Sequence, residues 1–253
     1  MKYAVVLAAG KGTRMKSELP KVLFPVSERP MIEYVLDALE QAGVDKIIVV
    51  VGHRSDLVRE ALAHRRNLEF VEQTEQLGTG HAVMTCHEKL SPHEESVMVV
   101  AGDCPMMQVD SIRKLFEAYH HESIEQRPSC ILGTALKNNP DGLGRILRDE
   151  KGEFQGIVED KDSSLEQKKI TEVNMSYYVF HTPDLLEALT HLRTDNAQKE
   201  YYLTDTPAIM KSQGKRVVAL PVLKPIESLG INTVEEANIV EEAMLLEKIK
   251  HRT

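Results

Sequence analysis

The sequence has no long hydrophobic run, few cysteines and no excess of positive charge. No stretch approaches the roughly 18 consecutive apolar residues of a membrane-spanning helix, and Met1 leads straight into a predicted strand, not a signal peptide. The three cysteines are scattered, which argues against a disulfide framework and favours a reducing compartment. A formal net charge of −8 offers no basic field for nucleic acid. We therefore expect a cytoplasmic protein that binds neither membranes nor nucleic acids.

Two common glycine motifs and a histidine metal site are also absent. The P-loop string Gly-x-x-x-x-Gly-Lys-Ser/Thr does not occur, and the dinucleotide fingerprint needs a glycine where Met15 stands. The ten histidines do not fall at the regular spacing of zinc ligands. A nucleotide site in this chain must therefore use a different loop.

The most informative feature that is present is the string Leu7-Ala8-Ala9-Gly10-Lys11-Gly12-Thr13-Arg14. It follows a short apolar run at 3–6 that is typical of a buried parallel strand, so the glycines fall where the chain must turn. Both glycines allow positive φ, which lets successive backbone N–H groups point at one anion. Arg14 and Lys21 add a planar fork and a compact point charge for phosphate oxygens. This combination predicts a cradle for a nucleoside triphosphate; the alternative is an ordinary turn with surface cations.

Further motifs occur in order along the chain. They are Pro20-Lys21, Gln73 to Ala82, Gly102-Asp103-Cys104-Pro105, Gly142 to Ile146, Val158 to Asp162, Asn196 to Asp205 and Gly230-Ile231-Asn232. The ordered set resembles the sugar-1-phosphate nucleotidylyltransferase family from the first strand to about residue 235. Within that family it is most similar to the uridylyltransferases that act on N-acetylglucosamine 1-phosphate. The resemblance implies a nucleotide-diphospho-sugar transferase fold.

The hydrophobic pattern agrees with an α/β fold. Strands are predicted at 5–7, 47–51, 68–71 and 97–100, and helices at 30–42, 55–64, 79–90 and 111–121. This alternation indicates a doubly wound, mostly parallel Rossmann-like sheet, whose ligands bind at the carboxyl ends of its strands. Gly10 and Asp103 both follow predicted strands, so one crevice can hold both.

After residue 130 the pattern changes to shorter strands, predicted at 145–148, 154–159 and 174–181. We interpret this part as a smaller β-rich sugar-binding lobe. The nucleotide lobe is then placed at about 1–128 and 205–235, and the sugar lobe at about 129–204. A closing helix is predicted at 234–250, with Ala237, Val240, Met244 and Leu245 on one side.

The resemblance implies that UTP and N-acetylglucosamine 1-phosphate give UDP-N-acetylglucosamine, a precursor for peptidoglycan and cell wall biogenesis, with pyrophosphate as the second product. A sugar-phosphate oxygen attacks the α-phosphorus in line, so positioning, cations and a metal supply nearly all of the catalysis. The expected cofactor is Mg²⁺, which takes one or two protein oxygens. By resemblance Asp103 and Asn232 share this ion. Local sequence alone also fits a turn aspartate before Pro105 and an asparagine that caps the following helix.

The resemblance also implies roles for the remaining site residues. Catalytic roles are predicted for Arg14, Lys21 and Asp103, and sugar binding for Gly144, Glu159 and Asn174. Nucleotide binding is predicted for Leu7, Ala8, Ala9, Gly10, Gly12, Thr13, Gln73, Gly78 and Thr79. The Gln73 amide can pair with a uracil edge or be a solvated strand-end group, and Thr79 is suited to cap the next helix. Relatives commonly have glycine where this chain has Ser176, whose hydroxymethyl group would narrow the sugar pocket.

Two other functions stay open. The substrate can instead be glucose 1-phosphate or dTTP, because uracil and thymine share their pairing edge. A non-catalytic, nucleotide-binding regulatory subunit is the other alternative, although such a subunit does not need the pair Asp103 and Asn232. The bifunctional relatives continue into a left-handed β-helix of hexapeptide repeats, and this sequence shows none. We therefore expect no acetyl transfer, and a monomer or weak oligomer.

Overall fold

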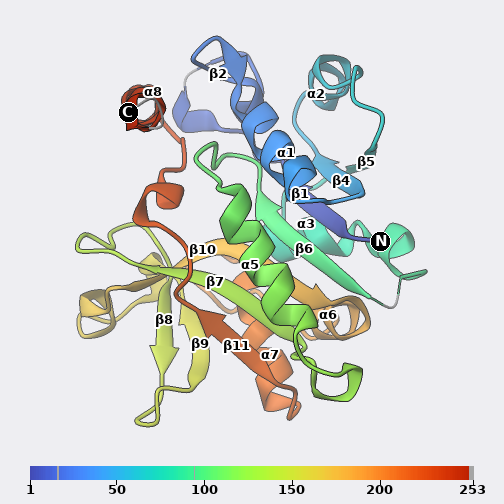
Figure 1. The fold of residues 1–253 in the computed structure, drawn as a ribbon, viewed down its shortest axis with the longest axis vertical. Helices are drawn as coiled ribbons and strands as arrows, with labels where there is room; N and C mark the ends of the chain where they lie inside the picture. Colours follow the sequence, from blue (N-terminus) through green and yellow to red (C-terminus); the bar gives the residue numbers. More distant parts are fainter. Residues whose placement is uncertain (16, 94, 251–253) are drawn as a thin grey trace.

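A computed structural model describes residues 1–15, 17–93 and 95–250. In these residues nine strands form one sheet, in the order β11-β7-β10-β6-β1-β4-β5, with β8 paired to β10 and β9 paired to β8; β2 pairs with β3 separately (Figure 1). Strand β10 is antiparallel to β6 and β7, whereas β6, β1, β4 and β5 are mutually parallel. The strands are β1 (Tyr3–Leu7), β2 (Pro25–Val26), β3 (Arg29–Pro30), β4 (Lys46–Val51), β5 (Leu68–Glu72), β6 (Ser96–Ala101), β7 (Cys130–Leu136), β8 (Arg145–Arg148), β9 (Phe154–Val158), β10 (Glu172–His181) and β11 (Val217–Leu220). The predicted mostly parallel α/β sheet is confirmed.

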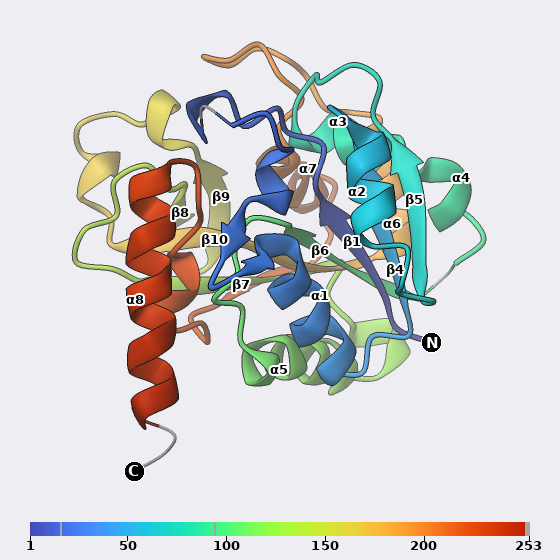
Figure 2. The same ribbon diagram turned by 90° about the horizontal axis from the view of Figure 1, so that it is seen from above.

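Helices cover both faces of this sheet. They are α1 (Met31–Gln41), α2 (Ser55–Ala61), α3 (Thr79–Met84), α4 (His87–Leu90), α5 (Val109–His120), α6 (Thr182–Leu189), α7 (Thr206–Ser212) and α8 (Val234–Lys250). Successive residues of β1 point to opposite faces, so Ala4 and Val6 pack with α1 and α5 while Val5 packs with α3 and α6. Figure 2 shows α1 and α5 on one side of the sheet and α3 and α7 on the other. Both faces of the central strands are therefore buried, which explains their continuous apolar sequence.

The sheet runs without interruption through the two predicted lobes. Strands β7 and β10 belong to the same sheet as β1 and β6, and β8 and β9 join it as a branch through the pairing of β8 with β10. Residue 129 is therefore not a break in the hydrogen-bonded structure. The division into a nucleotide lobe and a sugar lobe stays a prediction.

Two details of the predicted helices are wrong. The helix predicted at 79–90 is divided into α3 and α4 at Thr85, whose hydroxyl donates to the Ala82 carbonyl at 2.7 Å. Such a side-chain bond competes with the helical backbone pattern. Helix α8 spans the predicted residues, but Leu245 is 60% exposed whereas Met244 is buried. One residue turns an α-helix by about 100°, which carries Leu245 away from the buried side.

Helix α8 lies at one side of the molecule, where it packs on a small apolar cluster (Figure 2). This cluster joins Met15 and Met31 to Ile231, Ala237 and Val240. The segment that leads into α8 is thereby brought next to the loop after β1. None of the helices that the structure describes is long and apolar enough to cross a membrane.

Candidate active site

The loop after β1 presents a row of free backbone N–H groups. The Ala8 N–H donates to the Val50 carbonyl at 2.9 Å and continues the sheet. No acceptor among the described residues is bonded to the N–H groups of 9–13. Consecutive unpaired amides of this kind form an anion site. The loop therefore has the polarity that the sequence predicts for a phosphate cradle.

The two glycines of this loop differ. Gly12 has a φ of +59°, and a Cβ there would lie 2.5 Å from the Cβ of Lys21. Any side chain at this position would displace Lys21. Gly10 is not among the glycines with positive φ, and nothing lies within 4 Å of the position of its Cβ. Of the two glycines that allow a positive φ, only Gly12 adopts one.

Three distant segments meet at the ammonium group of Lys21. Its Nζ donates to the Asp103 carboxylate, which follows β6, and to Oδ1 of Asn232 at 2.6 Å, just before α8. The Lys21 side chain is 13% exposed and that of Asp103 is 26% exposed, so the pair is partly shielded from solvent. Arg14 also donates to Oδ1 of Asn232, at 2.8 Å. The structure thus brings together all four residues to which the sequence assigned catalysis or metal binding.

The alternative interpretation of Asn232 as a helix cap is wrong. The Glu236 N–H instead donates to Oγ1 of Thr233 at 3.2 Å, and the Glu236 carboxylate accepts from the Thr233 N–H at 3.1 Å. This reciprocal pair is a capping box, so Thr233 is the capping residue. The Asn232 amide oxygen remains available to the cations at the cleft.

A metal ion fits the donor set at this position. The Asp103 carboxylate and the Asn232 amide are hard oxygen donors, and both already converge on one cation, the Lys21 ammonium. Among the described residues no group of three or more His, Cys, Asp or Glu side chains could hold a metal. A site with two protein oxygens suits Mg²⁺, because this ion usually keeps waters and substrate phosphates in the rest of its shell.

A buried carboxylate fastens the segment that carries Asn232. Glu227 is 0% exposed, and its carboxylate accepts from the Gln108 N–H at 3.0 Å, the Ser111 hydroxyl at 2.7 Å and the Lys224 N–H at 2.8 Å. These contacts join the turn at Pro225–Ser228 to the N-terminus of α5. Nothing in the sequence selects Glu227, because two of its partners, Gln108 and Ser111, lie more than a hundred residues away in the chain.

A cleft of about 540 Å³ opens beside this cluster. Ten predicted site residues line it: Leu7, Ala8, Ala9, Gly10, Lys21, Gln73, Gly78, Thr79, Asp103 and Glu159. Six others are not in its lining: Gly12, Thr13, Arg14, Gly144, Asn174 and Asn232. Lys11, Gln76, Tyr178, Glu200, Leu203 and Thr204 line it without having been selected. Several of these fall inside motifs that carried the family resemblance, so the motifs marked the right segments without indicating which side chains turn inward.

One end of the cleft is formed where β5 leads into α3. Gln73 is only 3% exposed, which contradicts its interpretation as a solvated amide. Gly78 has a φ of +110°, and a Cβ there would lie 2.6 Å from the Tyr201 carbonyl oxygen. Thr79 does not cap α3, because the helix begins at Thr79 itself and its Oγ1 accepts from the Leu203 N–H at 3.1 Å. Thr79 therefore joins this end of the cleft to the segment after α6.

The three predicted sugar-binding residues lie close together beside the other end of the cleft, although only Glu159 lines it. The Asn174 N–H donates to the Gly144 carbonyl at 2.8 Å. A Cβ on Gly144 would lie 3.6 Å from Oε2 of Glu159, so these two residues are also neighbours. Ser176 lines the cleft with a φ of +55°, at a point where the register of β10 against β7 shifts. A positive φ favours glycine, so Ser176 holds a backbone conformation that residues with a side chain rarely adopt.

Burial makes the Glu159 carboxyl a weaker acid than an ordinary glutamate. Burial raises the pKa of its carboxyl above the ordinary value, and the negative charges of Asp205 and Asp162 add to the effect. The Thr204 hydroxyl donates to Oε1 of Glu159 at 2.9 Å and partly offsets the rise. A carboxylate held in this way is a strong acceptor for ligand hydroxyl groups.

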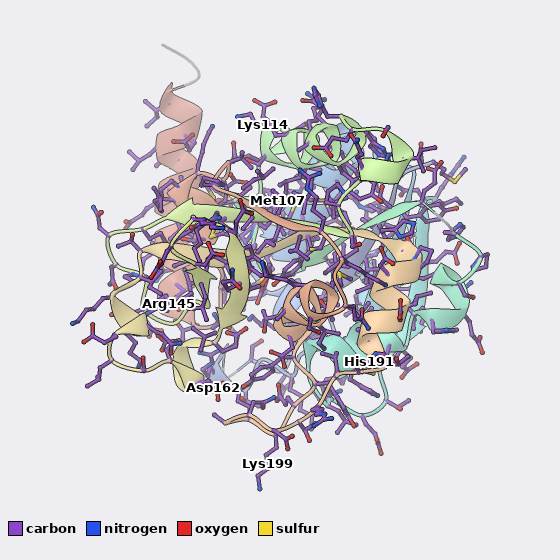
Figure 3. All side chains as sticks on the ribbon, turned by 90° about the horizontal axis from the view of Figure 1, so that it is seen from below. Met107, Lys114, Arg145, Asp162, His191 and Lys199 are labelled. Atoms are coloured by element: carbon purple, nitrogen blue, oxygen red, sulfur yellow. The ribbon has the colours of Figure 1, made fainter. Side chains whose placement is uncertain are left out.

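Arg145 connects the two loops of the sugar end. Its side chain is 0% exposed and lies beside β8 and β9 (Figure 3). The guanidinium donates to the Leu143 carbonyl and, at 3.0 Å, to the Asp160 carboxylate. In the chain, Leu143 directly precedes Gly144, and Asp160 directly follows Glu159. Arg145 thus fixes the distance between two predicted sugar-binding residues.

The site can be compared with known proteins. The model of the family described as MobA-like NTP transferase domain matches residues 4–202. The bifunctional protein GlmU of Lactococcus lactis subsp. cremoris strain SK11 is 45% identical over 231 residues, which cover 91% of this chain and 49% of that protein. The bifunctional protein GlmU of Clostridioides difficile strain 630 is 42% identical over 241 residues, covering 95% of this chain and 51% of that protein. The chain thus spans about half the length of these curated relatives.

A solved structure supports the fold. UDP-glucose pyrophosphorylase complexed with UDP-glucose superposes with a TM-score of 0.75 over 98% of this chain and 99% of that chain, at 19% sequence identity. This likeness agrees with the predicted nucleotide-diphospho-sugar transferase fold. From the family match and the geometry of the cleft, the chain belongs to the MobA-like NTP transferase family.

Proposed function

We propose that this chain transfers a uridylyl group from UTP to N-acetylglucosamine 1-phosphate, giving UDP-N-acetylglucosamine and pyrophosphate. The observation that carries the proposal is the meeting of Lys21, Asp103 and Asn232 beside a loop of free N–H groups. Cations, a carboxylate and an amide oxygen at one edge of a cleft are what phosphoryl-group chemistry needs. The relatives named bifunctional protein GlmU support the choice of substrates.

The reaction is a direct displacement. A sugar-phosphate oxygen forms a bond to the α-phosphorus, while the bond from that phosphorus to the bridging oxygen of pyrophosphate breaks. The N–H groups of 9–13 and the Arg14 guanidinium would bind phosphate oxygens and hold UTP for in-line attack. Lys21 would neutralise the negative charge that grows on the departing oxygen. No nucleophilic side chain is needed.

Asp103 and Asn232 would hold Mg²⁺. When bound there, the ion would supply charge neutralisation and orientation for the phosphate groups. Activity is therefore expected to disappear with EDTA and to return with added MgCl₂. Activity that resists EDTA would contradict this part of the proposal.

The two ends of the cleft would bind the two substrates. Gln73, Gly78 and Thr79 would contact the uridine, and Gly144, Glu159 and Asn174 would contact the sugar. We further propose a cytoplasmic location and a monomer or weak oligomer.

A pyrophosphate-release screen tests the proposed function. UTP, dTTP, CTP and ATP are each combined with N-acetylglucosamine 1-phosphate or glucose 1-phosphate. We expect UTP with N-acetylglucosamine 1-phosphate to be the best pair. A preference for dTTP or for glucose 1-phosphate would overturn the substrates and leave the reaction class in place. UTP binding without turnover on either sugar phosphate would instead support the regulatory subunit.

A further inference from the structure

The side-chain amide of Gln73 is held in one orientation. Its Nε2 lies 3.1 Å from the Gly78 carbonyl oxygen and 3.0 Å from Nδ1 of His81. A backbone carbonyl can only accept, so the amide atom that faces it must be the nitrogen. An amide nitrogen has no lone pair to offer, so Nδ1 of His81 accepts the second hydrogen. The neutral His81 ring then carries its own hydrogen on Nε2.

This arrangement leaves a single polar atom of Gln73 for a ligand. Both amide hydrogens are used, and Oε1 has no hydrogen-bond partner among the residues that the structure describes. Gln73 lines the cleft and is only 3% exposed, so a mismatched polar group placed against it would stay unpaired. An acceptor at this point matches the N3–H of uracil. The same acceptor would face the N3 lone pair of cytosine, with which it cannot form a hydrogen bond.

His81 is itself held by the start of α3. The Gly80 N–H donates to the Tyr201 carbonyl at 2.7 Å, and Oγ1 of Thr79 accepts from the Leu203 N–H. The His81 ring lies 6.4 Å from the Tyr201 ring, measured between centroids. The first turn of α3 is therefore tied to residues 201–203, and this fixes where Nδ1 points.

We infer that His81 is a positioning residue for base selection: by accepting from Gln73 it keeps Oε1 turned to the cleft, so that the site favours uracil over cytosine. The inference rests on the proposed uridylyl transfer and adds a residue that does not line the cleft. His81 acts through Gln73 and needs no contact with the nucleotide.

Binding of UDP and CDP, measured by titration calorimetry without sugar phosphate, tests the inference. His81→Phe keeps a ring and removes the acceptor, so the preference for UDP over CDP is expected to fall roughly five- to tenfold, the scale of one hydrogen bond. His81→Asn restores an acceptor near Nδ1 and should keep the preference within about threefold. His87→Phe, an exposed ring change on α4, is the matched control and should leave the preference unchanged. Should the phenyl ring destabilise the protein, His81→Lys, which only donates, replaces it with the same expectation.

A double variant separates positioning from packing. If His81 acts through Gln73, His81→Phe should have no further effect on the preference in a Gln73→Ala background. An unchanged preference in His81→Phe, or an equal loss of affinity for both nucleotides, overturns the inference. Failure of the proposed function looks different, because the unsubstituted protein would then bind UDP no better than CDP.

Discussion

The two ends of the cleft are built in different ways. At the nucleotide end, the phosphate loop follows β1 and Asp103 follows β6, and these two strands are neighbours in the parallel sheet. At the sugar end, Gly144 precedes β8, Glu159 follows β9 and Asn174 lies in β10. These strands pair antiparallel, and the buried Arg145 bonds to Leu143 and Asp160 beside the first two residues. Parallel strands place their carboxyl ends at one edge whatever the details of side-chain packing. The sugar end instead depends on each long-range contact, so single substitutions there should mainly change binding.

The strongest test of this comparison is Asp103→Asn. The substitution removes the charge that pairs with Lys21 and half of the proposed metal site, so turnover should fall by about 10³-fold, the upper range for one electrostatic group. Steady-state pyrophosphate release measures the loss, and circular dichroism checks the fold. Asp110→Asn, at an exposed position of α5, is the control and should retain activity. Near-normal turnover in Asp103→Asn would leave that residue as an ordinary turn aspartate.

Lys21→Ala should have the next largest effect. The lysine is expected to stabilise charge that grows only as pyrophosphate departs, so kcat should fall by at least ~10²-fold with a smaller change in UTP affinity. Single-turnover kinetics and direct UTP titration separate the two quantities. Lys114→Ala, an exposed lysine on α5 visible in Figure 3, is the control. Weaker UTP binding with unchanged kcat would mean that Lys21 only docks the nucleotide.

Most of the nucleotide end could be predicted from the sequence, because its residues follow strands whose apolar pattern is plain. The family resemblance implied that Asp103 and Asn232 share one ion, although their spacing in the chain cannot show it, and their common contact with Lys21 was not predicted. What the sequence could not show depends on tertiary contacts. Glu227 and Arg145 are ordinary charged residues until their partners are known. Thr79 was predicted as a helix cap. Its actual contact, with Leu203, could not be predicted because it spans 124 residues.

The two glycines of the phosphate loop provide a matched pair. Gly12→Ala requires a strained φ and a collision with Lys21, so the free energy of unfolding should fall by about 1–3 kcal/mol. Gly10→Ala meets open space without a positive φ and should be neutral or stabilising by up to about 1 kcal/mol. Urea unfolding of both variants checks the difference. Equal losses would show that the loop tolerates no side chain at either position.

Arg145→Lys tests whether sugar-phosphate binding can be weakened without weakening UTP binding. Lysine keeps the charge but not the planar fork that reaches the Leu143 carbonyl and Asp160 together. We expect the KM for the sugar phosphate to rise about tenfold, the scale of one or two lost hydrogen bonds, while the KM for UTP stays within about twofold. Arg113→Lys, on the exposed side of α5, is the control. A parallel rise of both KM values would mean that the two ends are mechanically coupled.

The smallest expected effect is a pH dependence set by Glu159. Because burial raises the pKa of this carboxyl above its unfolded-state value, the folded state binds the proton more tightly. The Glu159 contribution to folding stability therefore increases as pH falls through the folded-state pKa. Sugar binding should change in the opposite direction, since only the ionised carboxylate accepts from two hydroxyl groups at once.

Glu159→Gln should remove both dependences together. In the unsubstituted protein, affinity for the sugar phosphate is expected to fall severalfold on mild acidification, starting at a higher pH than an ordinary carboxyl would give. The second ionisation of the phosphate lies near pH ~6 and affects both proteins equally, so the ratio of their affinities isolates Glu159. Titration calorimetry for binding and urea unfolding, both followed as the pH falls from neutral towards the ordinary carboxyl pKa, provide the two curves. If Glu159→Gln lost the same affinity for the sugar phosphate on acidification, the carboxylate would not contact the sugar. The comparison of the two ends would then rest on Arg145 alone.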